Sequence, residues 1–276
     1  MRLLKKNFCD ISPAAYAISE ENEILKRKLS DALAIRKGRV KFAETRQKDL
    51  LPVLISSHDS GMIKKGPGIE PELQENKAVN IRLASAKLDG LIIQPGETFS
   101  FWRTIGRTTR RKGYKDGRVI IANRLRPGVG GGLCNLGNTI HLLALYSPLT
   151  VTEMHTHSDA LAPDEGPRKP FATGTSVAFN YIDLRFRNDT DQPFQLHVWT
   201  ENGRSYAQLL SMEPCPYTYE LTEEGHRFQK EGEKYYRVGK IYRVTKEKAT
   251  DKVLDKQLIR DNHSEVMYDY SLIPDA

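Results

Sequence analysis

The segment Gly128-Val129-Gly130-Gly131-Gly132-Leu133-Cys134-Asn135 decides the fold expected for this chain, because it joins a glycine-rich turn to an apolar, helix-favouring run, Leu136 to Tyr146. Glycine accepts backbone conformations that other residues avoid, and it lets a ligand approach the main chain closely. We therefore predict that a helix starts at this turn and that Cys134 lies among its unpaired N–H groups. Those groups and the positive end of the helix dipole favour the thiolate, which is both a nucleophile and a metal ligand.

Two histidines downstream, in Met154-His155-Thr156-His157-Ser158, are the candidate bases. Apolar and polar residues alternate from Leu149 to Thr152, which predicts a strand that runs into both histidines and places their imidazoles on one face. One imidazole would take the thiol proton and return it to a leaving amine, as a general acid–base catalyst does.

Three oxygen-bearing side chains are candidates to orient that imidazole, namely Ser158, Asp159 and Asp183. Asp183 is more simply interpreted as an outward-facing strand carboxylate. A further histidine, His141, shares a helix face with Cys134 but stands about two turns away, which is too far for contact.

Five segments carry a family pattern and together cover roughly residues 75 to 200. They are Leu91-Ile92-Ile93-Gln94-Pro95-Gly96-Glu97-Thr98-Phe99-Ser100-Phe101, Tyr114-Lys115-Asp116-Gly117, Gly130-Gly131-Gly132-Leu133-Cys134, His157-Ser158 and Ile182-Asp183-Leu184-Arg185-Phe186-Arg187-Asn188-Asp189-Thr190. In these segments the chain resembles the VanW family. The resemblance implies L,D-transpeptidase-like chemistry on cell-wall peptidoglycan through a cysteine acyl-enzyme at Cys134, and a link to glycopeptide (vancomycin) resistance clusters.

The resemblance also ranks the site residues. By motif position His157 stands above His155 as the base. Backbone N–H groups of the turn would stabilise the oxyanion, and the residues expected to provide them are Gly130, Gly131, Gly132 and Asn135. The implied partner is a peptidoglycan stem peptide or its precursor, and neither a cofactor nor a metal is required.

Two departures from the family pattern keep other functions open. Family members commonly have Gln after the cysteine and Ser two residues further on, where this chain has Asn135 and Gly137, and the usual Asp-Ala-Thr-Val reads Gly174-Thr175-Ser176-Val177. The alternative is a non-catalytic accessory protein that binds a wall precursor or a resistance-cluster partner. A lesser alternative is a zinc site formed by Cys134, His155 and His157, although no paired-cysteine motif supports it.

Composition bounds the partners and the compartment. The 276 residues carry a formal net charge of +7 and a pI of about 9.2, with 39% hydrophobic and 28% charged residues. These values are typical of a soluble globular protein, and the dispersed Lys and Arg residues argue against a nucleic-acid partner. The segment Met1 to Asp10 leads into no apolar stretch long enough for a signal peptide or membrane span, and the three cysteines suggest no disulfide framework. We therefore expect a cytoplasmic protein without an integral membrane segment, which would need unconventional export to reach finished wall.

The patterns predict an α+β fold, with N-terminal helices followed by a mainly antiparallel sheet core and a helix that starts at the Gly-rich turn. We expect a helical region and linker over 1–72, a VanW-like domain over 73–212 and a β-rich extension over 213–276. In the helical region, a helix capped by Ser19 and stopped by Gly38 would pack its apolar stripe on its own domain, or alternatively dock a partner or a membrane surface. The stripe consists of Leu25, Leu29, Ala32 and Leu33.

Further elements are predicted along the rest of the chain. Residues 57–72 are expected to be a loop, followed by a helix from Glu75 to Leu88 that ends at Asp89-Gly90. Asn202-Gly203 indicates a tight hairpin. Two short strands over 235–238 and 241–244 are expected, and the charged segment 246–256 is expected to be a loop or an exposed helix.

Overall fold

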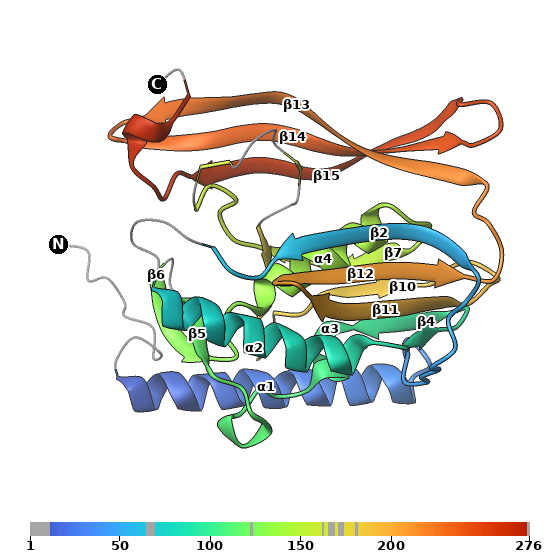
Figure 1. Ribbon diagram of the computed structural model, residues 1–276, viewed down its shortest axis with the longest axis horizontal. Coiled ribbons are helices and arrows are strands. Elements are labelled where there is room, and N and C mark those ends of the chain that lie inside the picture. Colours follow the sequence, from blue (N-terminus) through green and yellow to red (C-terminus); the bar gives the residue numbers. More distant parts are fainter. Residues whose placement is uncertain are drawn as a thin grey trace.

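The computed structural model describes residues 12–64, 70–121, 124–161, 163–164, 169–170, 174–179 and 182–274. Its helices are α1 (Pro13–Arg36), α2 (Pro71–Leu88), α3 (Phe101–Ile105) and α4 (Leu133–Leu145), with short 3-10 turns at Arg110–Lys112 and Tyr270–Leu272. Helix α1 lies along one side of the molecule, and a long sheet of the last three strands lies on the opposite side (Figure 1). Helices α2 and α4 and the shorter sheets lie between them (Figure 1).

The strands form mostly antiparallel sheets. One sheet has the order β1 (Lys41–Phe42), β4 (Glu97–Ser100), β10 (Arg185–Arg187), β7 (Thr150–Glu153), in which β1 and β4 are parallel. A second, antiparallel throughout, has the order β2 (Val53–Gly61), β12 (Arg204–Ser211), β11 (Phe194–Glu201), β3 (Ile92–Ile93). The remaining strands are the antiparallel three-stranded sheet β13 (Tyr217–Glu231), β14 (Lys234–Glu247), β15 (Val253–Glu265) and the pairs β5 (Asp116–Ile121) with β6 (Arg124–Val129) and β8 (His155–Thr156) with β9 (Thr175–Ser176). The predicted α+β class is confirmed.

Helix α4 is the central element of the core. Ten of its 13 residues are buried, which is the pattern of a helix enclosed on nearly every side. Leu136, Ile140 and Leu143 are fully enclosed and belong to the same cluster as Ile81 of α2 and Phe186 of β10. Each such side chain stabilises the fold by about 1.5–3 kcal/mol relative to exposure. This packing fixes where α4 begins, and therefore where Cys134 lies.

The start of helix α1 differs from the prediction. The helix begins at Pro13, six residues before Ser19, because Ser12 accepts a hydrogen bond from Ala15 N at 3.1 Å and proline is well suited to a first helical turn. The prediction that Gly38 follows the helix end is confirmed, since Lys37 is the C-cap and Gly38 has a φ of 64°.

The apolar stripe of α1 is not buried. Leu25, Leu29 and Leu33 are 54%, 56% and 54% exposed, so the predicted packing of this stripe on its own domain is wrong. The helix buries Ala15 and Ile24 instead, and polar contacts also hold it. Arg27 donates to both carboxylate oxygens of Glu153 at 2.8 and 2.7 Å, and Arg185 donates to both oxygens of Asp31 at 2.8 and 2.7 Å.

The loop predicted over 57–72 is partly wrong. Strand β2 continues through Gly61 because it pairs with β12 along its length, and α2 starts at Pro71 rather than at Glu75. The predicted end of α2 at Asp89-Gly90 is confirmed, and Gly90 has a φ of 75°.

The C-terminal strands are longer than predicted. The runs 235–238 and 241–244 belong to one strand, β14. The segment 246–256, predicted as a loop or exposed helix, contains the end of β14, a turn and the start of β15. Gly239 does not interrupt β14, because it lies opposite a bulge in β13, where a β-carbon would stand 3.3 Å from the Cα of His226. The Asn202-Gly203 hairpin is confirmed, with φ angles of 48° and 74° that suit a tight two-residue turn.

Candidate functional site

The glycine turn before α4 is packed so tightly that side chains are excluded from it. A β-carbon on Gly131 would stand 2.2 Å from the carbonyl carbon of Gly117, and one on Gly132 would stand 2.1 Å from Cγ of Lys77. Gly132 also has a φ of 90°, in the left-handed region that favours glycine. A β-carbon on a third glycine, Gly130, would stand 2.6 Å from Oγ1 of Thr108. The turn is therefore closely covered by neighbouring segments, and side chains cannot be accommodated at these three positions.

Asn80 of α2 holds this turn in place. Its Nδ2 donates to the carbonyl oxygens of Lys115 and Gly131, both at 3.0 Å, and its Oδ1 accepts from Lys115 N at 2.8 Å. Asn80 is fully buried, and all three bonds are made inside the protein. Neither Asn80 nor Lys77 was predicted as a site residue from the sequence, because polar residues are frequent along this helix and nothing local distinguishes these two.

Cys134 is the second residue of α4, as predicted, but its thiol is not activated by that position. The residue is half-buried, and its Sγ donates to Val177 O at 3.7 Å. Burial raises the pKa of the Cys134 thiol, and backbone hydrogen bonds at Val177 and at Cys134 itself oppose this only in part. The prediction that the helix start favours thiolate over thiol is therefore not supported in this state, since desolvation outweighs these backbone hydrogen bonds.

The backbone N–H groups near the thiol differ in whether they have acceptors. Gly130 N, Gly131 N and Asn135 N donate to backbone carbonyls at 2.9, 3.0 and 3.1 Å, so these three donors are occupied in this state, and their role in an oxyanion hole stays a prediction. Within the described part of the chain, no acceptor is found for the N–H groups of Gly132 and Leu133, and the Cys134 N–H bonds to its own thiol sulfur. Gly132 caps the helix without a side chain, which leaves the donors of the first turn open.

The two predicted bases lie in different surroundings. His157 Nδ1 lies 2.7 Å from Ser158 O, so this nitrogen carries the proton and Nε2 has the lone pair. Burial lowers the pKa of His157. His155 Nε2 lies 3.0 Å from Glu153 Oε1. The predicted continuous strand is interrupted between them, because β7 ends at Glu153 and β8 covers only His155–Thr156.

Neither histidine contacts the thiol. Strand β9 runs beside α4, with Cys134 next to Val177 at one end, whereas His157 N donates to Gly174 O, at 2.8 Å, at the other end. Three residues of extended chain span about 10 Å, which places His157 beyond hydrogen-bonding reach of Cys134 in this state. The part of the chain that is described contains no hydrogen bond between Cys134 and a histidine. The catalytic pairing stays a prediction.

The comparisons with known proteins agree with the motif pattern. Residues 76–210 match a family model described as VanW like protein. This chain belongs to the VanW family. It is 28% identical over 227 residues to the Vancomycin B-type resistance protein VanW of Enterococcus faecalis, which covers 82% of each chain. It is 29% identical over 137 residues to the uncharacterized protein YoaR of Bacillus subtilis, which covers 50% of this chain and 44% of that relative. No solved structure gives a significant match.

The resemblance led us to expect an aspartate where this chain has Gly174, and the structure shows what occupies that space. A β-carbon there would stand 2.8 Å from Nη1 of Arg260 and 3.2 Å from Cβ of Asp159. Asp159 is buried, lies within hydrogen-bonding range of Asn262 Nδ2 at 3.3 Å, and its charge raises the pKa of His157, although less than burial lowers it. Arg260 and Asp159 therefore occupy the space that an aspartate side chain at position 174 would need.

Asp183, a further candidate to orient the base, is used for another purpose. It is 3% exposed and accepts from Ser100 Oγ at 2.6 Å, from Trp102 N at 3.0 Å and from Arg185 Nε at 2.7 Å. Its interpretation as an outward-facing carboxylate is therefore wrong. Asp183 joins the VanW motif strand β10 to the start of α3.

His141 is a buried residue of the core rather than a base for Cys134. It is fully buried, and its Nδ1 lies 3.1 Å from Thr175 Oγ1. Burial lowers the pKa of His141 to about 4. Among the described residues, no group of three His, Cys, Asp or Glu side chains is placed to hold a metal ion, so the geometry does not support the zinc alternative. In the same residues no helix is both long and apolar enough to cross a membrane.

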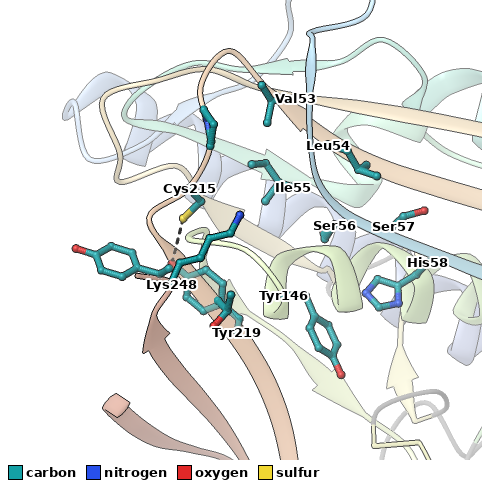
Figure 2. Close-up of a pocket in the computed structure, with 13 residues that line it drawn as sticks. Val53, Leu54, Ile55, Ser56, Ser57, His58, Tyr146, Cys215, Tyr219 and Lys248 are labelled. Atoms are coloured by element: carbon teal, nitrogen blue, oxygen red, sulfur yellow. Dashed lines mark hydrogen bonds between the residues drawn. The ribbon is translucent and has the colours of Figure 1, made fainter. Parts of the chain in front are cut away.

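A separate cavity of about 320 Å³ lies where β2 meets the start of β13 (Figure 2). Cys215 lies at one side of it, with Sγ 3.9 Å from the hydroxyl of Tyr219, and His58 and Tyr146 pack together at the other with ring centroids 5.0 Å apart (Figure 2). Cys134 does not line this cavity.

Proposed function

We propose that this VanW-family protein transfers acyl groups on peptidoglycan stem peptides through a thioester at Cys134. The observation that carries the proposal is the position of the thiol at the start of α4, next in the chain to the N–H groups of Gly132 and Leu133, which have no acceptor among the described residues. A peptide carbonyl could approach the thiol there, and the N–H groups would stabilise the negative oxygen that develops during attack.

The reaction has two halves. The sulfur attacks the peptide carbonyl carbon, the C–N bond breaks, and the thiol proton passes through a base to the leaving amine. An acceptor amine then attacks the thioester, a new amide bond forms, and the thiol is restored. His157 is proposed as the base because Ser158 O holds its Nδ1–H, which leaves Nε2 to accept a proton. Substrate binding would have to bring Nε2 and the thiol closer together than they are in this state.

The printed name of the Enterococcus faecalis relative supports a connection with vancomycin resistance. We propose that this chain has a related role in bacteria exposed to glycopeptides, with peptidoglycan or its precursor as the substrate. The family match supports the class of protein, and the acyl transfer and the peptidoglycan substrate are the parts that need an experiment.

The deciding experiment is intact-mass spectrometry after incubation with tetrapeptide-bearing peptidoglycan fragments. We expect an acyl adduct on the wild-type protein and on Cys215→Ala, and none on Cys134→Ala. Cys215 is the matched control because it is also a free, half-buried cysteine. An adduct that persists in Cys134→Ala, or no adduct on the wild type, would overturn the proposal.

A second function, binding without chemistry, is favoured by one observation. The Cys134 thiol has a raised pKa and is not hydrogen-bonded to a histidine, so nothing in this state activates it. An accessory protein would bind a wall precursor at the same turn without forming a thioester. Equal affinity of the wild type and Cys134→Ala for the fragments, without any adduct, would establish this role.

A further inference from the structure

A buried lysine lies against the candidate site. Lys77 on α2 is 8% exposed, and its side-chain stem packs on Gly132, two residues before Cys134. It stands one helical turn before Asn80, which holds the same turn by hydrogen bonds. Lysine is almost never buried to this extent without a partner.

No such partner of Lys77 is found among the residues that the structure describes. In the part of the chain that the structure describes, its ammonium makes no hydrogen bond or ion pair. Arg118 of β5, a half-buried residue, also has no side-chain partner there. Asp116, the carboxylate nearest to Arg118 in sequence, already accepts a hydrogen bond from Arg110 Nη2 at 2.6 Å.

The positive charges act on one another. Burial, together with the positive charges of Lys64 and Arg118, lowers the pKa of Lys77 to about 8. Positive charges that lie close together in a partly desolvated site repel one another. An anion between them would reduce this repulsion and accept hydrogen bonds from their N–H donors. Arginine is suited to a planar carboxylate, because its N–H groups can donate to both oxygens at once.

We propose that Lys77 and Arg118 bind a carboxylate of the peptide substrate beside the Gly132–Cys134 turn. This carboxylate site would fix the register of the peptide, so that the scissile carbonyl meets the thiol and the open N–H groups. It rests on the proposed peptide substrate but not on acyl transfer, since a binding protein would use it in the same way.

The test measures binding without chemistry, in a Cys134→Ser background of the full chain. The probes are a soluble stem tetrapeptide with free carboxylates and the same peptide with every carboxylate amidated, and calorimetry at low salt measures both affinities. We expect the free acid to bind more tightly, and we expect Lys77→Met to reduce that preference about tenfold, because Met keeps the buried stem and removes the charge-assisted hydrogen bond. Lys87→Met is the matched control, since Lys87 is an exposed lysine on the same helix.

Several outcomes would overturn the carboxylate site. Equal affinity for the two peptides, or an unchanged preference in Lys77→Met, would do so, as would inorganic phosphate that binds through Lys77 more tightly than the free-acid peptide. If circular dichroism shows that Lys77→Met does not fold, Arg118→Gln decides in its place, with the same expected loss. An acyl adduct at Cys134 without a carboxylate preference overturns this site alone, whereas a preference without an adduct overturns acyl transfer alone.

Discussion

The side-chain stem of Lys77 occupies the space that a β-carbon on Gly132 would need, with Cγ 2.1 Å from that position. Gly132→Ala should therefore unfold more easily, because the new methyl group collides with the stem and the backbone has a φ of 90°. We expect the free energy of unfolding to fall by about 3 kcal/mol, the sum of overpacking and a strained backbone. Urea denaturation followed by circular dichroism measures it.

Gly38→Ala separates these two effects. Gly38 also has a positive φ, of 64°, but a β-carbon there would meet nothing within 4 Å. This control should lose only about 1 kcal/mol, the cost of the left-handed backbone. Equal losses in the two variants would show that the contact between Lys77 and Gly132 is not tight.

Asp183→Ala should be strongly destabilising. The side chains of Asp183 and Arg185 are only 4% and 12% exposed. Removal of the carboxylate takes one negative charge away from the buried Arg185 guanidinium and leaves Ser100 Oγ without its acceptor. We expect a loss of about 3 kcal/mol in the free energy of unfolding. The control is Asp189→Ala, since the Asp189 side chain pairs with Arg187 but is 39% exposed, and it should change stability by less than about 1 kcal/mol. Similar losses for both variants would contradict the structural role of Asp183.

The features predicted correctly have local causes. The start of α4 follows from glycines before an apolar run, the hairpin follows from Asn202-Gly203, and the end of α2 follows from Asp89-Gly90. In each case the residues at the turn or helix end carry the preference themselves. The boundaries predicted for three regions, 1–72, 73–212 and 213–276, stay a prediction.

The features predicted wrongly depend on residues far away in the chain. Two separate strands were expected over 235–238 and 241–244, but a bulge in β13 lies opposite Gly239 and the strand continues. Asp183 was assigned to the surface by alternation, whereas Ser100, 83 residues earlier, bonds it in the interior. The thiol of Cys134 was expected to be acidic, but core packing desolvates it. Periodicity reports which residues share a face, and it does not report what covers that face.

Stability should fall in mild acid because of His141. Burial lowers its pKa in the folded state to about 4, against about 6.5 in an unfolded chain. The unfolded state therefore takes up the proton first, so the stabilisation is fully present above about pH 6.5 and is lost as the pH falls toward 4. At about 1.36 kcal/mol per pH unit, the loss between pH 6.5 and pH 5 is about 2 kcal/mol.

Urea unfolding at pH 7 and pH 5 measures this loss in the wild type and in His141→Gln, which should lose less between the two pH values. His263→Gln serves as the control, because the His263 side chain is 53% exposed on β15. This variant should keep the wild-type dependence. If His141→Gln keeps it as well, His141 is not the group responsible.

The reactivity of Cys134 distinguishes burial from the helix dipole as the dominant influence. Burial raises the pKa of this thiol, so its alkylation by iodoacetamide should be slow at neutral pH, with a midpoint above that of a free cysteine. The Cys215→Ala variant removes the other free cysteine of the described chain, and peptide mapping of the alkylated product assigns the signal to Cys134. If a stem peptide brings His157 to the thiol, adding the peptide should accelerate the alkylation of Cys134 in the Cys215→Ala variant. The same peptide should not accelerate it in the double variant Cys215→Ala, His157→Gln. A midpoint below neutral pH without peptide would mean that the N–H groups of the first turn outweigh desolvation, and that the thiolate forms without a base.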